Sequence, residues 1–308
     1  MEIISKLPCL NNLNKVNKIN AEVGGIISGR IDKFLLIVGP CSADDPTAVL
    51  EYAEQLARIH QKVGDKICIV VRVFTAKPRS ACSGYMGLVH EPGGVETARS
   101  LHLAVNDQAG LPTADELLYP ALLPYFEGIV SYFAIGARSS ENQEHRLVAS
   151  GLTTPAGLKN PISGDLQSMA NAVSAANAPH DFIFGGHMVR SDGNPLAHGI
   201  LRGGVQPNYH ANNLRTLHEM GLSAVIVDAS HANSGKNYRH QPQIAMDVLE
   251  SRRQSPSIRG LVKGLMVESY IEEGAANRGA QAFGQSITDP CLGLAATEKL
   301  IYEIADKL

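Results

Sequence analysis

The chain has 308 residues, of which 44% are hydrophobic, so it is long enough to bury a large core. Its formal net charge is −3 and its lysines and arginines are dispersed, which excludes a basic surface for nucleic acid. The sequence has neither the ~18-residue apolar run of a membrane span nor the basic and apolar segments of a secretory signal, and this predicts a cytoplasmic protein that does not bind membranes.

Eight short apolar runs follow residue 33, and each has the length of a buried strand. Each run is followed by a side chain able to bind a metal or an anion; in chain order these are Cys41, Arg72, Glu116, Arg138, Lys159, Arg202, His231 and Glu268. Amphipathic stretches of helical length separate the runs or follow the last one, at residues 46–62, 95–109, 139–150, 165–178, 208–220, 240–253 and 289–306. This alternation predicts an α/β fold, a (β/α)8 TIM barrel, whose eight strand ends meet at one rim.

The flanking and connecting segments carry three further predictions. Residues 34–308 are predicted to form the catalytic barrel, and residues 1–33 a short N-terminal arm or a β-hairpin that packs on the barrel bottom or on another subunit. The Asp-Pro pairs at 45–46 and 289–290 predict the N-caps of two helices. The Gly- and Ser-containing stretch 80–94 follows the second strand and is predicted to be a mobile cover over the rim.

Four residues near the strand ends have the side chains of a transition-metal site. Cys41 and His231 offer a thiolate and an imidazole, while Glu268 and Asp289 offer carboxylates. Taken singly, each has a commoner explanation: a small buried hydrophobic residue, a structural histidine, or a solvated or capping carboxylate. Together at one rim they predict a site for divalent Mn, Fe, Co or Zn, and the sulfur ligand disfavours Mg.

Cationic side chains form a second group near the same strand ends. Its members are Arg72, Lys77, Arg79, Arg138, Lys159 and Arg202. A single surface cation usually serves only solubility, but several of these stand in apolar segments, where burial of positive charge requires compensating anions. Because arginine grips phosphate and carboxylate through paired hydrogen bonds, the sequence predicts a substrate with at least two anionic groups.

The motifs that contain these residues resemble a known family. In chain order they are IVGPCSADDP, VVRVFTAKPRS, AIGARSSENQEHR, SGLTTPAGLKN, ILRGG, VDASHANSGK, LMVES and SITDPC, spanning about residues 34 to 292. They resemble the metal-dependent 3-deoxy-D-arabino-heptulosonate 7-phosphate (DAHP) synthases of the microbial type, which start the shikimate pathway to aromatic amino acids. The resemblance implies a transferase on a TIM barrel that condenses phosphoenolpyruvate with erythrose 4-phosphate and releases phosphate.

The resemblance also implies a role for each matching residue. Cys41, His231, Glu268 and Asp289 correspond to the metal ligands. The phosphoenolpyruvate site is implied to comprise Arg72, Lys77, Glu116, Ala137, Arg138, Lys159 and Arg202. Arg79 and Ser80 correspond to the aldose-phosphate end. Lys77, Glu116, Lys159 and His231 are the residues expected to take part in the chemistry, and the family's habit predicts a homodimer or homotetramer.

Two departures from the family pattern leave alternatives open. Met86 stands where the family has a lysine that holds phosphoenolpyruvate, in a segment one residue longer, and Gln285 replaces another lysine. A lost cation weakens a buried phosphate contact. The chain is therefore also consistent with a divergent enzyme that joins phosphoenolpyruvate to a different aldehyde in a specialised pathway. A third interpretation is a non-catalytic regulatory barrel.

Overall fold

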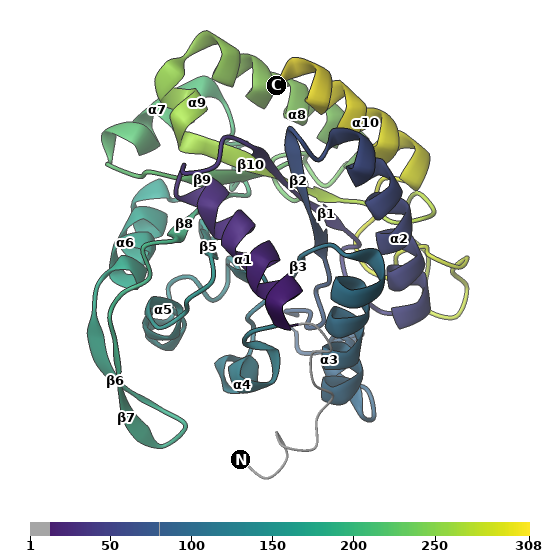
Figure 1. Ribbon diagram of the computed structural model, residues 1–308, viewed down its shortest axis with the longest axis horizontal. Coiled ribbons are helices and arrows are strands. Elements are labelled where there is room, and N and C mark those ends of the chain that lie inside the picture. The colour runs from purple at the N-terminus through teal and green to yellow at the C-terminus, as the bar shows by residue number, and fades with distance from the viewer. Residues whose placement is uncertain (1–12, 80) are drawn as a thin grey trace.

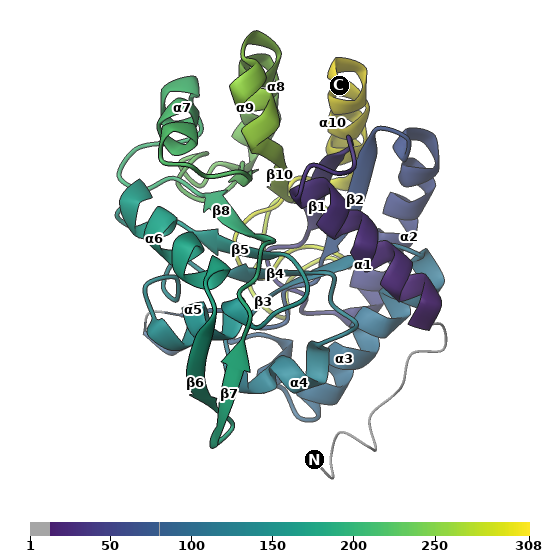
Figure 2. The ribbon, with the colours of Figure 1, turned by 60° about the vertical axis from the view of Figure 1, so that its left-hand side comes forward.

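The computed structural model describes residues 13–79 and 81–308. Eight parallel strands close into a barrel in the order β1-β10-β9-β8-β5-β4-β3-β2, and helices surround it (Figures 1 and 2). The strands are β1 (Phe34–Gly39), β2 (Ile67–Arg72), β3 (Thr113–Glu116), β4 (Tyr132–Ile135), β5 (Ala156–Lys159), β8 (Ala197–Leu201), β9 (Val225–Asp228) and β10 (Val262–Glu268). All eight predicted strands are present, and the TIM-barrel prediction is confirmed.

Seven helices match the predicted amphipathic stretches. They are α2 (Pro46–Val63), α3 (Gly94–Ala104), α5 (Gln143–Ser150), α6 (Leu166–Asn177), α7 (Ala211–Glu219), α8 (Gln241–Gln254) and α10 (Leu294–Lys307). The structure adds α4 (Leu123–Phe126), α9 (Pro256–Leu261), a π turn over Val105–Ala109, and 3-10 turns over Leu88–His90, Pro120–Leu122 and Tyr238–His240.

Only one of the two Asp-Pro pairs caps a helix. Asp45 caps α2 as predicted, because its carboxylate accepts hydrogen bonds from the amides of Thr47 and Ala48. The prediction that Asp289 caps the last helix is wrong, since α10 begins at Leu294 with Gly293 as its N-cap. Asp289 lies instead in a loop at the rim of the barrel, where its carboxylate is available for other contacts.

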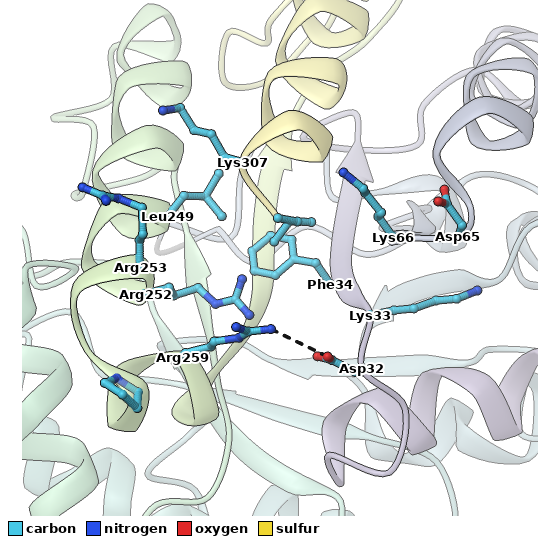
Figure 3. A pocket seen from close by; sticks show the side chains of 12 residues that line it. Asp32, Lys33, Phe34, Asp65, Lys66, Leu249, Arg252, Arg253, Arg259 and Lys307 are labelled. Atoms are coloured by element: carbon cyan, nitrogen blue, oxygen red, sulfur yellow. Dashed lines mark ion pairs between the residues drawn. The ribbon is translucent and has the colours of Figure 1, made fainter.

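The described part of the N-terminal arm is a helix, α1 (Leu13–Ile27), so the β-hairpin alternative is wrong. Val16, Val23 and Ile26 are buried at helical spacing, which a strand would split between two faces. Val23 and Ile26 pack with Leu35 and other residues inside the bottom of the barrel, which α1 crosses in Figure 1. At the same end, the surface is hollowed between α8, α10 and the start of β1 (Figure 3).

The barrel interior explains why polar side chains reach one rim. Alternate strand residues fill the interior, for example Val70, Ala114, Ile200, Ile226 and Met266. The next residue on the same face, two positions later, falls at the strand end and is polar in each case: Arg72, Glu116, Arg202, Asp228 and Glu268. The alternation that builds the apolar core therefore also aims these side chains at the rim.

A hairpin outside the barrel was also not predicted. Strands β6 (His180–Phe184) and β7 (His187–Ser191) form an antiparallel hairpin that extends from the barrel between α6 and β8 (Figures 1 and 2). Its side chains include the exposed Ile183 and Met188. Within the described residues, none of the helices has the length and apolar character needed to cross a membrane.

A buried histidine inside the barrel leads to a prediction about pH. His198 Nε2 lies 2.8 Å from the Tyr132 hydroxyl and Nδ1 lies 2.8 Å from the Leu196 carbonyl oxygen, contacts that a neutral ring satisfies. Burial lowers the pKa of His198 from 6.5 to about 4. Between these values the unfolded chain binds a proton that the folded chain excludes, so the free energy of unfolding should fall by about 3 kcal/mol as pH decreases through this window.

Urea denaturation at pH 7 and at acid pH measures this effect. His198→Asn should lose less stability on acidification than the wild type, whereas the same change at the exposed His218 on α7 should leave the pH dependence as it is. Equal losses in the wild type and His198→Asn would contradict the prediction.

Candidate active site

Three of the four predicted metal ligands converge at the rim. Cys41 follows β1, Glu268 ends β10, and Asp289 lies in the loop before α10; their ligand atoms all lie within 4.8 Å of one another. The Cys41 thiol donates to Asp289 Oδ2 over 3.4 Å. Cys41 and Glu268 are buried, while the Asp289 side chain is half-exposed, so the cluster opens to solvent on one side.

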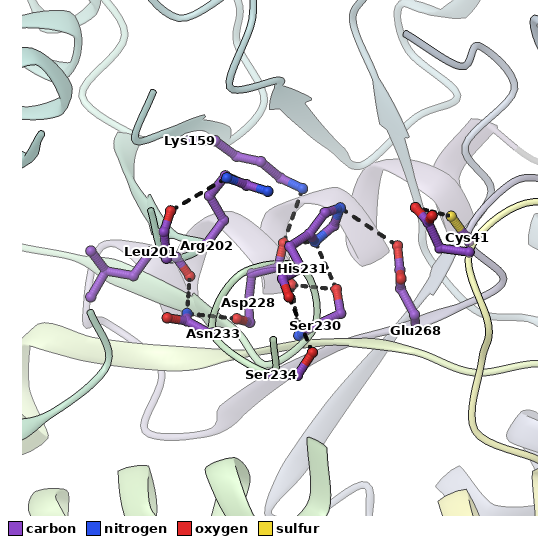
Figure 4. A network of polar contacts seen from close by, with 12 residues as sticks. Cys41, Lys159, Leu201, Arg202, Asp228, Ser230, His231, Asn233, Ser234 and Glu268 are labelled. Atoms are coloured by element: carbon purple, nitrogen blue, oxygen red, sulfur yellow. Dashed lines mark hydrogen bonds and ion pairs between the residues drawn. The ribbon is translucent and has the colours of Figure 1, made fainter. Parts of the chain in front are cut away.

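His231, the fourth predicted ligand, stands beside this cluster (Figure 4). Its Nε2 lies 3.8 Å from Glu268 Oε1, and its Nδ1 lies 2.8 Å from Asp228 Oδ2 and 2.7 Å from Ser230 Oγ. Its backbone has a φ of 54°, uncommon for a residue other than glycine. A proton on Nδ1 satisfies Asp228 and leaves the Nε2 lone pair facing Glu268, which is the usual orientation of a metal-binding histidine.

The chemistry of this donor set fits a divalent cation. Burial, and then the nearby Glu268 carboxylate, raise the pKa of Cys41 to about 11, so the thiol needs a neighbouring cation to ionise. Lys77 Nζ lies 2.6 Å from Cys41 Sγ and 3.5 Å from Asp289 Oδ2, and supplies positive charge to these two groups. One sulfur, one nitrogen and two carboxylates are a ligand set that suits Mn, Fe, Co or Zn.

Arg72 is the largest fully buried side chain and reaches the same place from β2. Its Nη2 lies 2.9 Å from Glu268 Oε1 and donates to the Cys41 carbonyl oxygen over 3.2 Å. Gly39 lets the Arg72 backbone come close to β1, because a Cβ at position 39 would lie 2.4 Å from the Arg72 carbonyl oxygen. Its Nε and Nη1 are buried without a hydrogen-bond partner among the described residues, so Arg72 keeps two donors available for an anion.

The sequence pattern assigned no role to Asp228, but its carboxylate contacts both His231 and Lys159. This buried carboxylate at the end of β9 lies 3.0 Å from Lys159 Nζ and accepts hydrogen bonds from both the amide and the hydroxyl of Ser230 (Figure 4). Burial opposes ionisation of Asp228, but His231 and Lys159 outweigh it and lower its pKa well below the usual range. The signal that could have identified it is the strand alternation, since Asp228 follows Ile226 on the inward face.

The remaining residues of the predicted phosphoenolpyruvate site surround this centre less tightly. Glu116 Oε1 is buried without a hydrogen-bond partner in the described structure, and a Cβ on Gly136 would lie 2.2 Å from it. Ala137 is half-buried and Arg138 exposed in the turn after β4. Burial lowers the pKa of Arg202, and the charge of Arg138 adds to this decrease, which indicates that the two cations lie near each other.

The segment after β2 carries the predicted aldose-phosphate residues and one departure. Arg79 Nε donates to the Tyr85 carbonyl oxygen over 3.0 Å, so this guanidinium is used within its own loop. Ser80 lies outside the described residues. The amide of Lys77 donates to the Met86 carbonyl oxygen over 2.9 Å, which ties the loop to the rim through its backbone. That 80–94 moves as a cover stays a prediction.

Gln285, the second departure, is held in the loop that precedes Asp289. Its Nε2 donates to the Glu273 carbonyl oxygen over 3.1 Å, and its Oε1 accepts from the Ala282 amide over 3.2 Å. The side chain therefore organises its own loop.

Asp115, a residue of β3, holds neighbouring parts of the rim in place through its carboxylate. Its carboxylate accepts from the Thr75 amide over 2.9 Å, from the Thr75 hydroxyl over 2.6 Å and from the Glu116 amide over 2.7 Å, while His102 Nε2 lies 3.1 Å away. These contacts hold Thr75, two residues before Lys77, together with the backbone of Glu116. Asp115 is thus a positioning residue for two predicted catalytic side chains.

We expect Asp115→Ala to lower kcat/KM for the anionic substrate about tenfold or more, because misplacement of a positioned group by about 1 Å costs on the order of 100-fold in rate. Steady-state kinetics measure this effect. Asp165→Ala is the control: it removes the N-cap of α6, costs about 1 kcal/mol of stability and should leave kcat/KM unchanged. Equal kinetic effects in both variants would mean that Asp115 acts only through stability.

Known proteins are similar to this chain in both sequence and structure. A model described as the DAHP synthetase I family matches residues 13–301. The Phe-sensitive phospho-2-dehydro-3-deoxyheptonate aldolase of Escherichia coli strain K12 is 37% identical over 99% of this chain and 92% of the relative. The Trp-sensitive enzyme of that strain is 38% identical over 91% and 85%. The solved structure of the phospho-2-dehydro-3-deoxyheptonate aldolase from Francisella tularensis SCHU S4 covers 99% of this chain and 95% of its own, with a TM-score of 0.92 and 32% identity. The chain therefore belongs to the DAHP synthetase I family.

Proposed function

We propose that this protein condenses phosphoenolpyruvate with erythrose 4-phosphate to give DAHP and phosphate, the reaction of a 3-deoxy-7-phosphoheptulonate synthase. The observation that carries the proposal is the convergence, at one barrel rim, of the Cys41, Glu268 and Asp289 cluster with the buried cations Arg72 of β2 and Lys159 of β5. Such a rim offers both a metal site and an anion site, and the two substrates are anions that must meet. Membership of the family supports the same reaction.

In this proposal Cys41, His231, Glu268 and Asp289 hold a divalent ion. The chemistry that such an ion supplies when bound is polarisation of the aldehyde oxygen of the acceptor. Cationic side chains of the protein position phosphoenolpyruvate and the aldose phosphate. Arg72 and Lys77 bind one end of phosphoenolpyruvate, and Arg138, Lys159 and Arg202 bind its phosphate; Arg79 and Ser80 bind the aldose phosphate. Because two molecules are joined, positioning supplies much of the acceleration.

Glu116 has the environment of a proton carrier. Its buried, unpartnered Oε1 can accept a proton from the water that adds to C2 of phosphoenolpyruvate after C3 has attacked the aldehyde carbon. Lys77 or Lys159 assists in this transfer. When the C2–O bond to the phosphate then breaks, the guanidinium groups of Arg138 and Arg202 neutralise the leaving anion.

The test is consumption of phosphoenolpyruvate in the presence of erythrose 4-phosphate, with and without chelator and added Mn. We expect turnover that chelation abolishes and a divalent metal restores. Full turnover in the presence of chelator would refute the proposed metal site.

A second candidate keeps phosphoenolpyruvate and changes the aldehyde. It is favoured by Met86, which occupies the position of an expected phosphate-binding lysine. Phosphate release measured across a panel of aldehydes distinguishes the two, since the better substrate gives the higher kcat/KM. Undetectable metal in carefully purified protein, together with no turnover on any aldehyde, would instead support the regulatory barrel. The homodimer or homotetramer and the cytoplasmic location stay predictions.

A further inference from the structure

One cavity of the described structure lies at the opposite end of the barrel from the proposed active site. It has a volume of about 390 Å³ and lies between the carboxyl ends of α8 and α10 and the starts of β1 and β2 (Figure 3). Sites for small molecules usually have volumes of about 300–1,000 Å³. Six of its lining residues are cationic, namely Lys33, Lys66, Arg252, Arg253, Arg259 and Lys307, and two are acidic, namely Asp32 and Asp65. We refer to it as the basal pocket.

Part of this positive charge has an ordinary explanation. Helix carboxyl ends attract cations, and Arg253 and Lys307 stand in the last turns of α8 and α10. Arg253 also pairs with Glu250 at 2.7 Å, and Lys66 Nζ donates to the Ala305 carbonyl oxygen over 2.6 Å. These cations do not by themselves indicate a ligand.

Arg252 and Arg259 also stand in last turns, those of α8 and α9, but the helix end leaves part of the Arg252 side chain without a partner. The guanidinium carbon of Arg252 lies 4.6 Å from the centre of the Phe34 ring, and its Nε is buried with no hydrogen-bond partner in the described structure. Burial, and then the like charge of Arg259, lower the pKa of Arg252 to about 10. Arg259 itself reaches only a long contact with Asp32, at 3.7 Å, from an exposed position. Two guanidinium groups thus adjoin one cavity, and the Asp32 carboxylate acts on both of them.

We propose that the basal pocket binds a small phosphate-bearing molecule through Arg252 and Arg259. A half-buried cation without a partner is stabilised by an anion, and a guanidinium matches a phosphate group with two parallel hydrogen bonds. Lys66 and Lys307 line the same pocket and add positive charge around a dianion. This site is independent of the proposed reaction, since its residues lie at the starts of the strands and the reacting residues lie at their ends.

Binding of inorganic phosphate to the full chain, measured by isothermal titration calorimetry, tests this proposal. The proposed active site also binds phosphate, so the measurements use an Arg202→Gln background that weakens that site. On this background we expect a phosphate site that Arg252→Gln weakens at least tenfold. Arg58→Gln, which removes an exposed arginine on α2 outside the pocket, should leave the affinity unchanged.

Two results would overturn the proposal. One is an isotherm that Arg252→Gln does not alter, in which case the arginines serve only the helix ends. The other is the absence of any phosphate binding in the Arg202→Gln background. If Arg252→Gln fails to fold, Arg259→Gln provides the same readout, because that side chain is 62% exposed and its loss leaves the fold intact. Calorimetry reports binding without turnover, so the outcome stands apart from the assay of the proposed reaction.

Discussion

Replacement of Cys41 by alanine is expected to abolish metal-dependent turnover and to leave the purified protein with far less bound metal. The thiol is buried, lies within 4.8 Å of the Glu268 and Asp289 ligand atoms, and is the only sulfur in the proposed ligand set. Substitution of groups that merely orient a ligand costs about 10- to 100-fold in metal affinity, so loss of a ligand should exceed that range.

Metal analysis of the purified variant and steady-state consumption of phosphoenolpyruvate measure the two effects. Cys82→Ala is the matched control, because Cys82 is a free cysteine in an exposed loop. The interpretation requires that Cys41→Ala lose both metal and activity while Cys82→Ala retains both. Wild-type metal content in Cys41→Ala would remove this residue from the ligand set.

Replacement of Asp228 by asparagine should impair both stability and activity. The carboxylate is buried between Lys159 Nζ at 3.0 Å and His231 Nδ1 at 2.8 Å. Asparagine removes the negative charge and leaves the Lys159 ammonium buried without its counterion, which costs about 3–5 kcal/mol. It also replaces one carboxylate oxygen with an NH2 donor, so the His231 tautomer is no longer fixed and metal affinity should fall by about 10- to 100-fold.

Urea denaturation and metal titration separate these two consequences. The comparison variant is Asp181→Asn on the β6–β7 hairpin, where the carboxylate pairs with Arg190 at 3.5 Å and both side chains are exposed. An exposed pair contributes about 0–1 kcal/mol, so Asp181→Asn should change stability and metal affinity very little. If Asp228→Asn binds metal as the wild type does, the orienting role assigned to Asp228 is wrong.

The sequence determined the architecture and the residues at the rim. Eight apolar runs, each followed by a metal- or anion-binding side chain, were sufficient because a closed parallel barrel necessarily brings its strand ends together. The order of the runs and the chemistry of the side chain after each run therefore predicted that Cys41, Glu268 and Asp289 are neighbours, although they lie far apart in the chain.

Tertiary structure alone decided which of these residues touch and which groups support them. Barrel closure places β1 beside β10, so that Cys41 meets Glu268, and β9 beside β10, so that His231 faces the same carboxylate. The hairpin alternative for the N-terminal arm is wrong because the apolar positions of α1 become meaningful only against the barrel bottom. The roles of Asp115 and of the basal pocket could not be predicted from the sequence for the same reason. They depend on which residues are neighbours in space, and the spacing of residues along the chain does not give that information.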